Sequence, residues 1–263
     1  MNLNVLLAKA INASVKGGIS VMEIYNSDFK VESKKDYSPL TLADKNCNDV
    51  ICSYLKNTGI PILSEEGVDI DFKDRKKWEY YWLVDPLDGT KEFINRNGEF
   101  TVNIALIHFN QPVMGVVYVP VKEVMYFALE GLGSYIVRTK SITNDLEYLI
   151  LKSTKLPISY NRKNYVVVGS RSHMSIETNQ FIDEKRIENS NLEIISIGSS
   201  LKICMVAEGK ADCYPRYAPT MEWDIAAGHA IAKMAGFSVQ KYGTKKELVY
   251  NKKTLLNPWF LVH

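Results

Sequence analysis

The chain has 263 residues, of which 46% are hydrophobic and 24% charged, and its formal net charge is +2. This composition is that of an ordinary globular protein, long enough for one or two domains. So small a net charge does not imply nucleic acid or an anionic membrane as the principal partner, and we expect neither. No CxxC pair occurs among the four cysteines, and the first residues carry no secretory signal, so we expect reduced thiols and a cytoplasmic protein. No feature indicates a stable protein partner.

Apolar residues recur at helical spacing from residue 3 to residue 25, with an interruption predicted at Gly17-Gly18. This pattern predicts an amphipathic surface helix packed on a core. Weak peripheral association with the inner face of a membrane is the alternative, but the polar face lacks the Lys and Arg that it would need. Uninterrupted apolar runs elsewhere fall short of the ~20 residues of a membrane span.

A polar, basic segment over residues 28–39 predicts a hairpin or loop, whose lysines form a solvated face unless one of them reaches a site. Residues 41–57 return to helical spacing, and Asp44 lies in the first turn of that predicted helix. By position alone, Asp44 is best explained as an acid that stabilises the helix dipole.

Two predicted strands end in carboxylates. Ile60–Leu63 leads into Glu65 and Glu66, and Tyr80–Val84 leads into Asp85-Pro86-Leu87-Asp88-Gly89-Thr90. Buried carboxylates are costly unless a positive group neutralises them, and carboxylate and carbonyl oxygens suit magnesium or manganese rather than zinc. Gly89 allows close approach to a ligand, and the amides of Gly89 and Thr90 could face a phosphate at a helix start.

The rest of the chain divides into two patterns. Short apolar runs separated by Gly, Pro and Asn predict an antiparallel meander over residues 100–138, followed by an irregular stretch over 139–163. Strands and helices then alternate up to residue 262. We therefore expect an α/β protein, with an α+β subdomain over residues 1–150 and an α/β subdomain over residues 151–263.

Two features of the second half could carry chemistry. Gly198-Ser199-Ser200 lies before a predicted helix and close to Lys202, where it would either cap the helix or bind an anion. Asp224 follows Trp223 at another predicted helix start, as a dipole acid or a further metal carboxylate. His173 and His229 are more readily explained as structural histidines than as ligands.

Taken in order, Glu65-Glu66, the Asp85-x-x-Asp88-Gly89-Thr90 segment and Trp223-Asp224 resemble the signature of the inositol monophosphatase superfamily, which is magnesium-dependent and lithium-sensitive. The resemblance covers nearly the whole chain. Lys91-Glu92-Phe93, Gly198-Ser199-Ser200-Leu201-Lys202 and Tyr214-Pro215-Arg216 are similar to the CysQ-type 3'(2'),5'-bisphosphate nucleotidases within it. The implied fold is the layered α/β/α/β/α sugar-phosphatase type.

This resemblance also implies roles for individual residues. Two or three magnesium ions would be held by Glu65, Asp85, Asp88, Asp224 and the carbonyl oxygen of Leu87. Asp44 and Thr90 would activate the attacking water, with Glu66 beside them, which reverses the positional reading of Asp44. The implied substrate contacts come from both halves of the chain: Glu65, Leu87, Asp88, Gly89, Thr90, Ser170, His173, Gly198, Ser200, Lys202 and Asp224.

The activity implied is hydrolysis of the 3'-phosphate of adenosine 3',5'-bisphosphate, a small-molecule nucleotide, to AMP and phosphate during sulfur assimilation. Clamping of the phosphoryl oxygens by paired metals explains the need for several acids. The sulfated nucleotide 3'-phosphoadenylyl sulfate is a second candidate substrate, and lithium is the expected inhibitor. The alternatives are an inositol- or sugar-phosphate phosphatase on the same scaffold and a non-catalytic nucleotide sensor.

Overall fold

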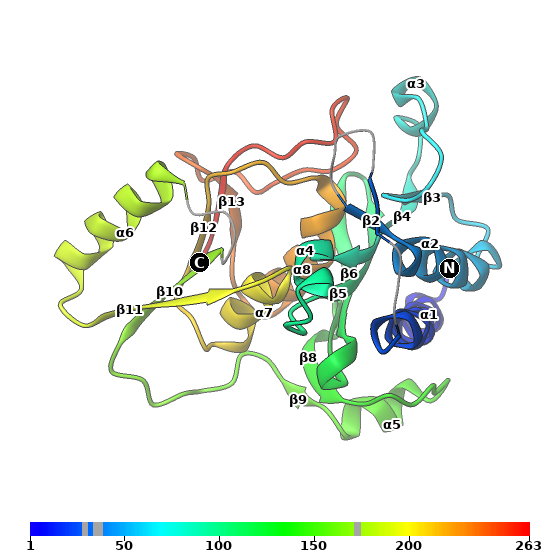
Figure 1. The fold of residues 1–263 in the computed structure, drawn as a ribbon, viewed down its shortest axis with the longest axis horizontal. Helices are drawn as coiled ribbons and strands as arrows, with labels where there is room; N and C mark the ends of the chain where they lie inside the picture. Colours follow the sequence, from blue (N-terminus) through cyan, green and yellow to red (C-terminus); the bar gives the residue numbers. More distant parts are fainter. Residues whose placement is uncertain (28–30, 34–38, 171–174) are drawn as a thin grey trace.

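The computed structural model describes residues 1–27, 31–33, 39–170 and 175–263. Its helices and sheets form five layers, which run across Figure 1 from α1 and α2 on the right to α6 on the far left. A seven-stranded sheet follows the first helix pair, then come α7 and α8, then the C-terminal strands, and α6 covers those strands on the outside. The predicted α/β/α/β/α architecture is therefore confirmed.

The large sheet has the strand order β3-β4-β5-β6-β7-β8-β9. β3 pairs with β4 in parallel, and every other pairing is antiparallel, as the meander pattern predicts. Its strands are Ile62–Ser64, Tyr80–Asp88, Thr101–His108, Gln111–Val119, Val124–Leu129, Gly133–Arg138 and Thr154–Lys155. A short 3-10 helix, Pro120–Lys122, joins β6 to β7.

Helices α1 (Leu3–Tyr25) and α2 (Leu42–Lys56) cover one face of this sheet. The predicted interruption at Gly17-Gly18 is wrong, because α1 continues through both glycines. A Cβ at Gly17 would lie 2.8 Å from Cys47 Sγ, and one at Gly18 would lie 2.5 Å from the Tyr118 ring. The two glycines thus let the helix approach α2 and the sheet closely, and the packing outweighs their poor helix propensity. The strands Val31–Ser33 and Pro39–Thr41 form an antiparallel pair before α2.

The opposite face carries α7 (Leu201–Glu208) and α8 (Glu222–Met234), which share a core cluster with the sheet. α8 is rich in alanine and approaches β6 so closely that a Cβ at Gly115 would lie 2.3 Å from the carbonyl oxygen of Ala227. This contact fixes the helix whose first turn carries Asp224.

Beyond α7, strands β10 (Tyr165–Ser170) and β11 (Leu192–Ile197) pair in parallel. The strands β12 (Tyr214–Arg216), β14 (Phe260–Val262) and β13 (Val239–Lys241) form a three-stranded sheet in that order. A parallel bridge from Val167 to Cys213 joins the two groups. α6 (Ile176–Glu188) packs on them through Phe181 and Ile182.

The segment predicted to be irregular, residues 139–163, contains α5 (Leu146–Leu151) and the edge strand β9. Asp145 caps α5 by accepting a hydrogen bond from the Tyr148 amide at 2.9 Å, and an Asp at this position is a local signal for a helix start. The short helix α3 (Phe72–Arg75) was also not predicted. The large sheet continues past the predicted subdomain boundary at residue 150 as far as Lys155, and one core cluster contains residues from both halves. The division into two subdomains at residue 150 therefore stays a prediction.

Helix α1 is long and apolar enough to cross a membrane by length and composition alone, although its sequence pattern predicted an amphipathic helix. However, 67% of its most apolar window is buried inside the protein, as expected of a core helix. All four cysteines are free thiols.

Candidate active site

The site begins where β4 ends. Asp85 is 1% exposed, and one of its carboxylate oxygens accepts a hydrogen bond from the Leu87 amide at 3.1 Å. The pairing of β4 with β5 shifts register between Asp85 and Asp88, so both acids emerge at the same end of the strand. Cys47 on α2 donates a hydrogen bond to the Pro86 carbonyl oxygen at 3.1 Å and helps to fix this turn.

Gly89 ends the turn with φ of 94°, a conformation that favours glycine, and α4 (Thr90–Ile94) follows directly. A Cβ at Gly89 would lie 3.2 Å from the Glu99 carbonyl oxygen. Thr90 lines the adjacent cavity, and its hydroxyl donates to the Leu87 carbonyl oxygen at 3.5 Å. The predicted helix start at Thr90 is therefore confirmed.

Asp224 enters the site from the opposite layer, in the first turn of α8. Its carboxylate accepts a hydrogen bond from the Met221 amide at 2.9 Å, which caps the helix. Its backbone carbonyl oxygen accepts one from the Ser200 hydroxyl at 2.6 Å. Asp224 therefore lies against the start of α7 as well as at the start of α8.

These acids perturb one another. The pKa of Asp85 is raised well above its ordinary value, chiefly by burial and then by Glu65, Asp88, Asp224 and Asp44. Burial also raises the pKa of Asp224, with Asp88 and Glu65 adding to it. For Asp88, burial raises the pKa while Lys202 and hydrogen bonds from Ser200 lower it. Mutual repulsion of this kind shows that carboxylates from β4, α8 and the turn after β3 share one region.

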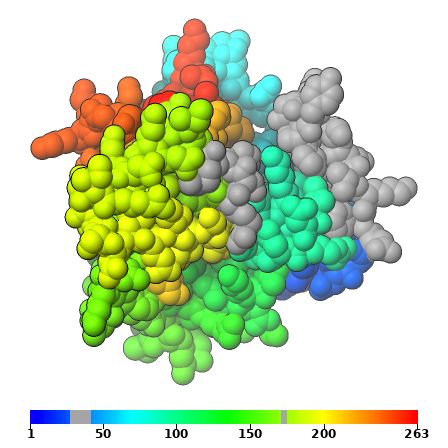
Figure 2. All heavy atoms as spheres, turned by 60° about the vertical axis from the view of Figure 1, so that its left-hand side comes forward, coloured from blue at the N-terminus to red at the C-terminus, as the bar shows by residue number. Residues whose placement is uncertain are grey.

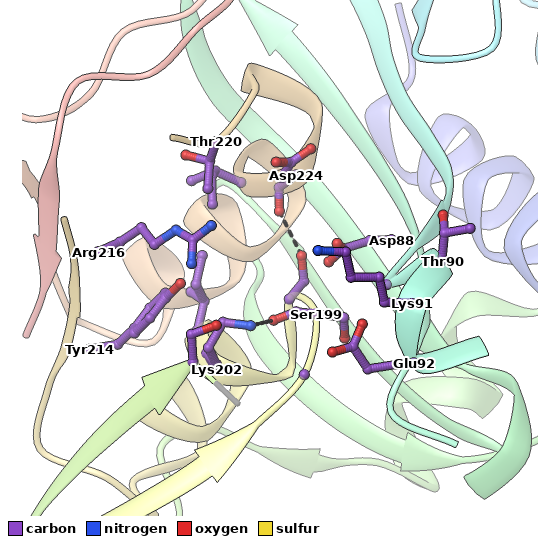
Figure 3. A pocket seen from close by; sticks show the side chains of 16 residues that line it. Asp88, Thr90, Lys91, Glu92, Ser199, Lys202, Tyr214, Arg216, Thr220 and Asp224 are labelled. Carbon is purple, nitrogen blue, oxygen red and sulfur yellow. Dashed lines mark hydrogen bonds between the residues drawn. The ribbon is translucent and has the colours of Figure 1, made fainter. Parts of the chain in front are cut away.

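A cavity of about 230 Å³ opens beside these acids (Figure 3). Asp88 and Asp224 line one part of it, whereas Arg216 and Tyr214 face it from β12. Lys202 lies in the same wall, 7% exposed, and donates a hydrogen bond to the Ser199 carbonyl oxygen. Burial lowers the pKa of Lys202 to about 8, although Asp88 opposes that shift. The cavity therefore brings acids and cations together, an arrangement suited to an anion held beside a metal.

The donor set fits a hard divalent cation. Within the described residues, no three acidic, histidine or cysteine side chains are already drawn into a ligand set around one point. The carboxylate oxygens of Asp85, Asp88 and Asp224 are of the donor type that magnesium takes. Two further buried oxygens beside β4, Thr101 Oγ1 and Asn103 Oδ1, have no partner in the described part of the chain.

The predicted site residues divide into two groups. Those lining the cavity are Asp88, Gly89, Thr90, Ser170, Gly198, Ser200, Lys202 and Asp224. Asp44 (2% exposed), Asp85 and Leu87 lie buried behind it, while Glu65 and Glu66 lie in the turn after β3. His173 falls outside the described residues, as do the basic-segment lysines Lys30, Lys34 and Lys35. His229 is buried, and its Nδ1 lies 2.9 Å from the Tyr250 hydroxyl, so its structural interpretation is supported.

No role was predicted for several residues that line the cavity: Lys91, Glu92, Tyr214, Arg216 and Thr220. The available signal was the position of Arg216 at the end of a strand in the half that carries Asp224. β12 pairs with β14 in the C-terminal sheet, and Tyr214 and Arg216 of β12 both line the cavity.

The two halves of the chain meet at this site. The Gly198 amide donates a hydrogen bond to Glu99 at 2.8 Å, and a Cβ at Gly198 would lie 2.7 Å from Glu92 Cγ. In Figure 2 the turquoise-green segment that contains residues 90–99 accordingly lies on the same face as the yellow C-terminal half. A layered α/β fold with acids and cations around one cavity between its layers is typical of phosphatases.

Comparison with known proteins gives the family. The model of the inositol monophosphatase family matches residues 2–259. The chain belongs to the inositol monophosphatase family. It is 41% identical over 261 residues to the 3'(2'),5'-bisphosphate nucleotidase CysQ of Salmonella typhimurium, an alignment that covers 98% of this chain and 99% of that protein.

Comparison with solved structures leads to the same family and fold. The crystal structure of CysQ from Bacteroides thetaiotaomicron, a bacterial member of the same family, is 50% identical and superimposes with a TM-score of 0.90 over 97% of this chain and 95% of that chain. The inositol monophosphatase of Thermotoga maritima, at 23% identity and a TM-score of 0.72 over 96% of this chain and 89% of that chain, shows the shared fold alone.

Proposed function

We propose that the chain is a magnesium-dependent 3'(2'),5'-bisphosphate nucleotidase that removes the 3'-phosphate of adenosine 3',5'-bisphosphate. The observation that carries the proposal is the pairing, in one cavity, of the acids Asp88 and Asp224 with the cations Lys202 and Arg216. A substrate with two phosphates needs both: a metal-binding end for the phosphate that is cleaved and a cationic end for the one that stays. The 41% identity to nucleotidases named CysQ supports the same choice.

In this proposal, Glu65, Asp85, Asp88, Asp224 and the Leu87 carbonyl oxygen hold the magnesium ions, with lithium as the expected inhibitor. Bound magnesium would supply positive charge to the phosphoryl oxygens and to the leaving alkoxide. Magnesium binding requires that these carboxyl groups be ionised. The raised pKa values of Asp85 and Asp224 oppose that ionisation until a cation is present.

The remaining steps belong to the protein. Asp44, which is buried and acts electrostatically on Asp85, accepts the proton of the attacking water, and the Thr90 hydroxyl orients that water. Glu66 supports them from the turn after β3. Gly89 and Gly198 border the cavity that receives the substrate, Lys202 and Arg216 hold the second phosphate, and Ser170 lines the nucleotide side. The products are AMP and phosphate, in the setting of sulfur assimilation, and 3'-phosphoadenylyl sulfate is a second substrate.

The test compares magnesium-dependent phosphate release from adenosine 3',5'-bisphosphate and from inositol 1-phosphate, with wild type and Arg216→Ala. We expect the bisphosphate to be preferred and Arg216→Ala to lower kcat/KM for it by about tenfold or more, since a hydrogen bond to a charged group is lost. Arg186→Ala is the matched control, because Arg186 lies on the outer helix α6, where its side chain is 55% exposed. Preference for inositol 1-phosphate would instead identify an inositol-phosphate phosphatase, and binding without turnover would identify a sensor.

A further inference from the structure

Helix α7 is hydrogen-bonded to the seven-stranded sheet at both of its ends. At its start, Asn103 Nδ2 on β5 donates to Ser200 Oγ at 3.0 Å. At its end, the Tyr126 hydroxyl on β7 donates to Glu208 Oε2 at 2.8 Å. Both bonds are buried, and both join the N-terminal sheet to the C-terminal half. They differ in position, because only the Asn103–Ser200 bond borders the cavity.

The Ser200 hydroxyl is also bonded on its other side. It donates its proton to the backbone carbonyl oxygen of Asp224 at 2.6 Å, so it accepts from Asn103. Asp88 lines the same cavity as Ser200, and hydrogen bonding from Ser200 lowers the pKa of Asp88. A continuous chain of contacts therefore runs from β5, through the start of α7, to the acids of β4 and α8. Ser200, predicted to contact substrate, has its hydroxyl proton committed within the protein.

The stability of the fold does not explain why a polar residue occupies position 103. It is 1% exposed, stands opposite Asp85 in the β4–β5 pairing, and its Oδ1 has no partner among the described residues. A buried amide with one group unpaired stabilises a fold less than an apolar side chain of the same shape would. The bond from its Nδ2 to Ser200 is what an apolar side chain could not provide.

We propose that Asn103 is a positioning residue that, through Ser200, sets the separation of Asp88 and Asp224 and thereby the affinity of the site for its divalent cation. The inference rests on the proposed function only in taking magnesium as that cation. Because like-charged carboxylates repel, a fixed tie between the two layers keeps them within reach of one ion. The Tyr126–Glu208 bond ties the same helix but reaches neither acid.

The experiment compares Asn103→Leu with Tyr126→Phe, each of which removes one buried bond between the sheet and α7. Magnesium binding is measured by isothermal titration calorimetry, and stability by thermal unfolding without metal. We expect Asn103→Leu to weaken magnesium binding by about tenfold. Tyr126→Phe should bind magnesium within about twofold of wild type, even though it lowers the melting temperature.

A second pair of variants keeps the test decisive if Asn103→Leu does not fold. Ser200→Ala should reproduce the loss of magnesium affinity, and Ser200→Thr, which keeps the hydroxyl, should restore it. The double variant Asn103→Leu/Ser200→Ala should lose no more magnesium affinity than either single variant, since the two residues act through one hydrogen bond.

If Asn103→Leu and Tyr126→Phe changed the magnesium affinity equally, or not at all, the proposal would be overturned, because the Asn103–Ser200 bond would then have only a structural role. Absence of magnesium binding by the wild type would overturn it too. Failure of the wild type to hydrolyse adenosine 3',5'-bisphosphate, with magnesium binding intact and weakened by Asn103→Leu, would refute the proposed substrate and leave the positioning role supported.

Discussion

Asp85, a predicted metal ligand, works against the stability of the metal-free fold. It is almost fully buried, and Glu65, Asp88, Asp224 and Asp44 all raise its pKa in addition to the effect of burial. A carboxyl whose pKa is higher in the folded state contributes stability only while it is protonated. That contribution is lost as the pH rises from its ordinary value of 3.8 through the raised one. At neutral pH the metal-free site therefore destabilises the fold.

Replacing Asp85 by Asn should separate stability from activity. Removing one repelling charge should raise the melting temperature of the metal-free protein at pH 7, by about 2–4 °C for each kcal/mol gained at this chain length. The same variant should lose phosphate release and the stabilisation that magnesium gives to the wild type, as measured by thermal unfolding with and without the ion.

The control is Asp69→Asn, because Asp69 is an exposed acid away from the cavity and should change neither quantity. A lower metal-free melting temperature for Asp85→Asn, together with an unchanged magnesium effect, would contradict this account of the acid cluster.

At the scale of elements, the site depends on how closely α8 approaches the large sheet. β6 offers Gly115 at the contact, and α8 offers the small residues Ala227 and Ala230. Backbone therefore meets backbone, and this placement brings the first turn of α8, with Asp224, to the end of β4. Larger residues at the contact would fill the space through which the helix approaches.

Gly115→Ala should accordingly be destabilising. Its added Cβ would lie 2.3 Å from the Ala227 carbonyl oxygen and 2.8 Å from Ala230 Cβ, so α8 must move. We expect the free energy of unfolding in urea to fall by about 1–3 kcal/mol, and kcat to fall as Asp224 shifts.

The matched control is Gly67→Ala, which adds the same methyl group at an exposed turn where the nearest atom lies 3.2 Å away. Equal losses in the two variants would show that the contact between α8 and β6 is not as close as described.

At the scale of the whole molecule, the two halves share a core. One buried cluster joins Leu83, Ala105 and Val117 of the large sheet to Ile203 of α7 and Ile231 of α8. The candidate site lies at the edge of the same junction. Subdomains that share apolar surface of this kind are expected to unfold together rather than in turn.

We therefore expect a single transition in urea, with coincident curves from far-UV circular dichroism and from the fluorescence of the four tryptophans. A fragment of residues 1–150 should not fold on its own, because the sheet face beneath α7 and α8 would be exposed. Two separated transitions, or a folded fragment, would show that the halves are independent domains.

Much of the fold was predictable because local sequence patterns specify many of its helices and strands. The meander appears as short apolar runs, and the acids of β4 follow a strand that ends in Asp85-Pro86. Where the prediction failed, a distant contact decided the structure: Gly17-Gly18 stays helical because Tyr118 and α2 pack against it. A local pattern carries no information about such a partner.

The sequence by itself determined the order of the longer elements, the family resemblance and the set of candidate acids, since each depends on patterns of residues that lie close together along the chain. Only the tertiary structure decided that Lys202 and Arg216 face the same cavity as Asp88, and that Asn103 reaches Ser200 across the layers. These pairs lie about a hundred residues or more apart, and their approach is fixed by close packing of the layers rather than by any local preference.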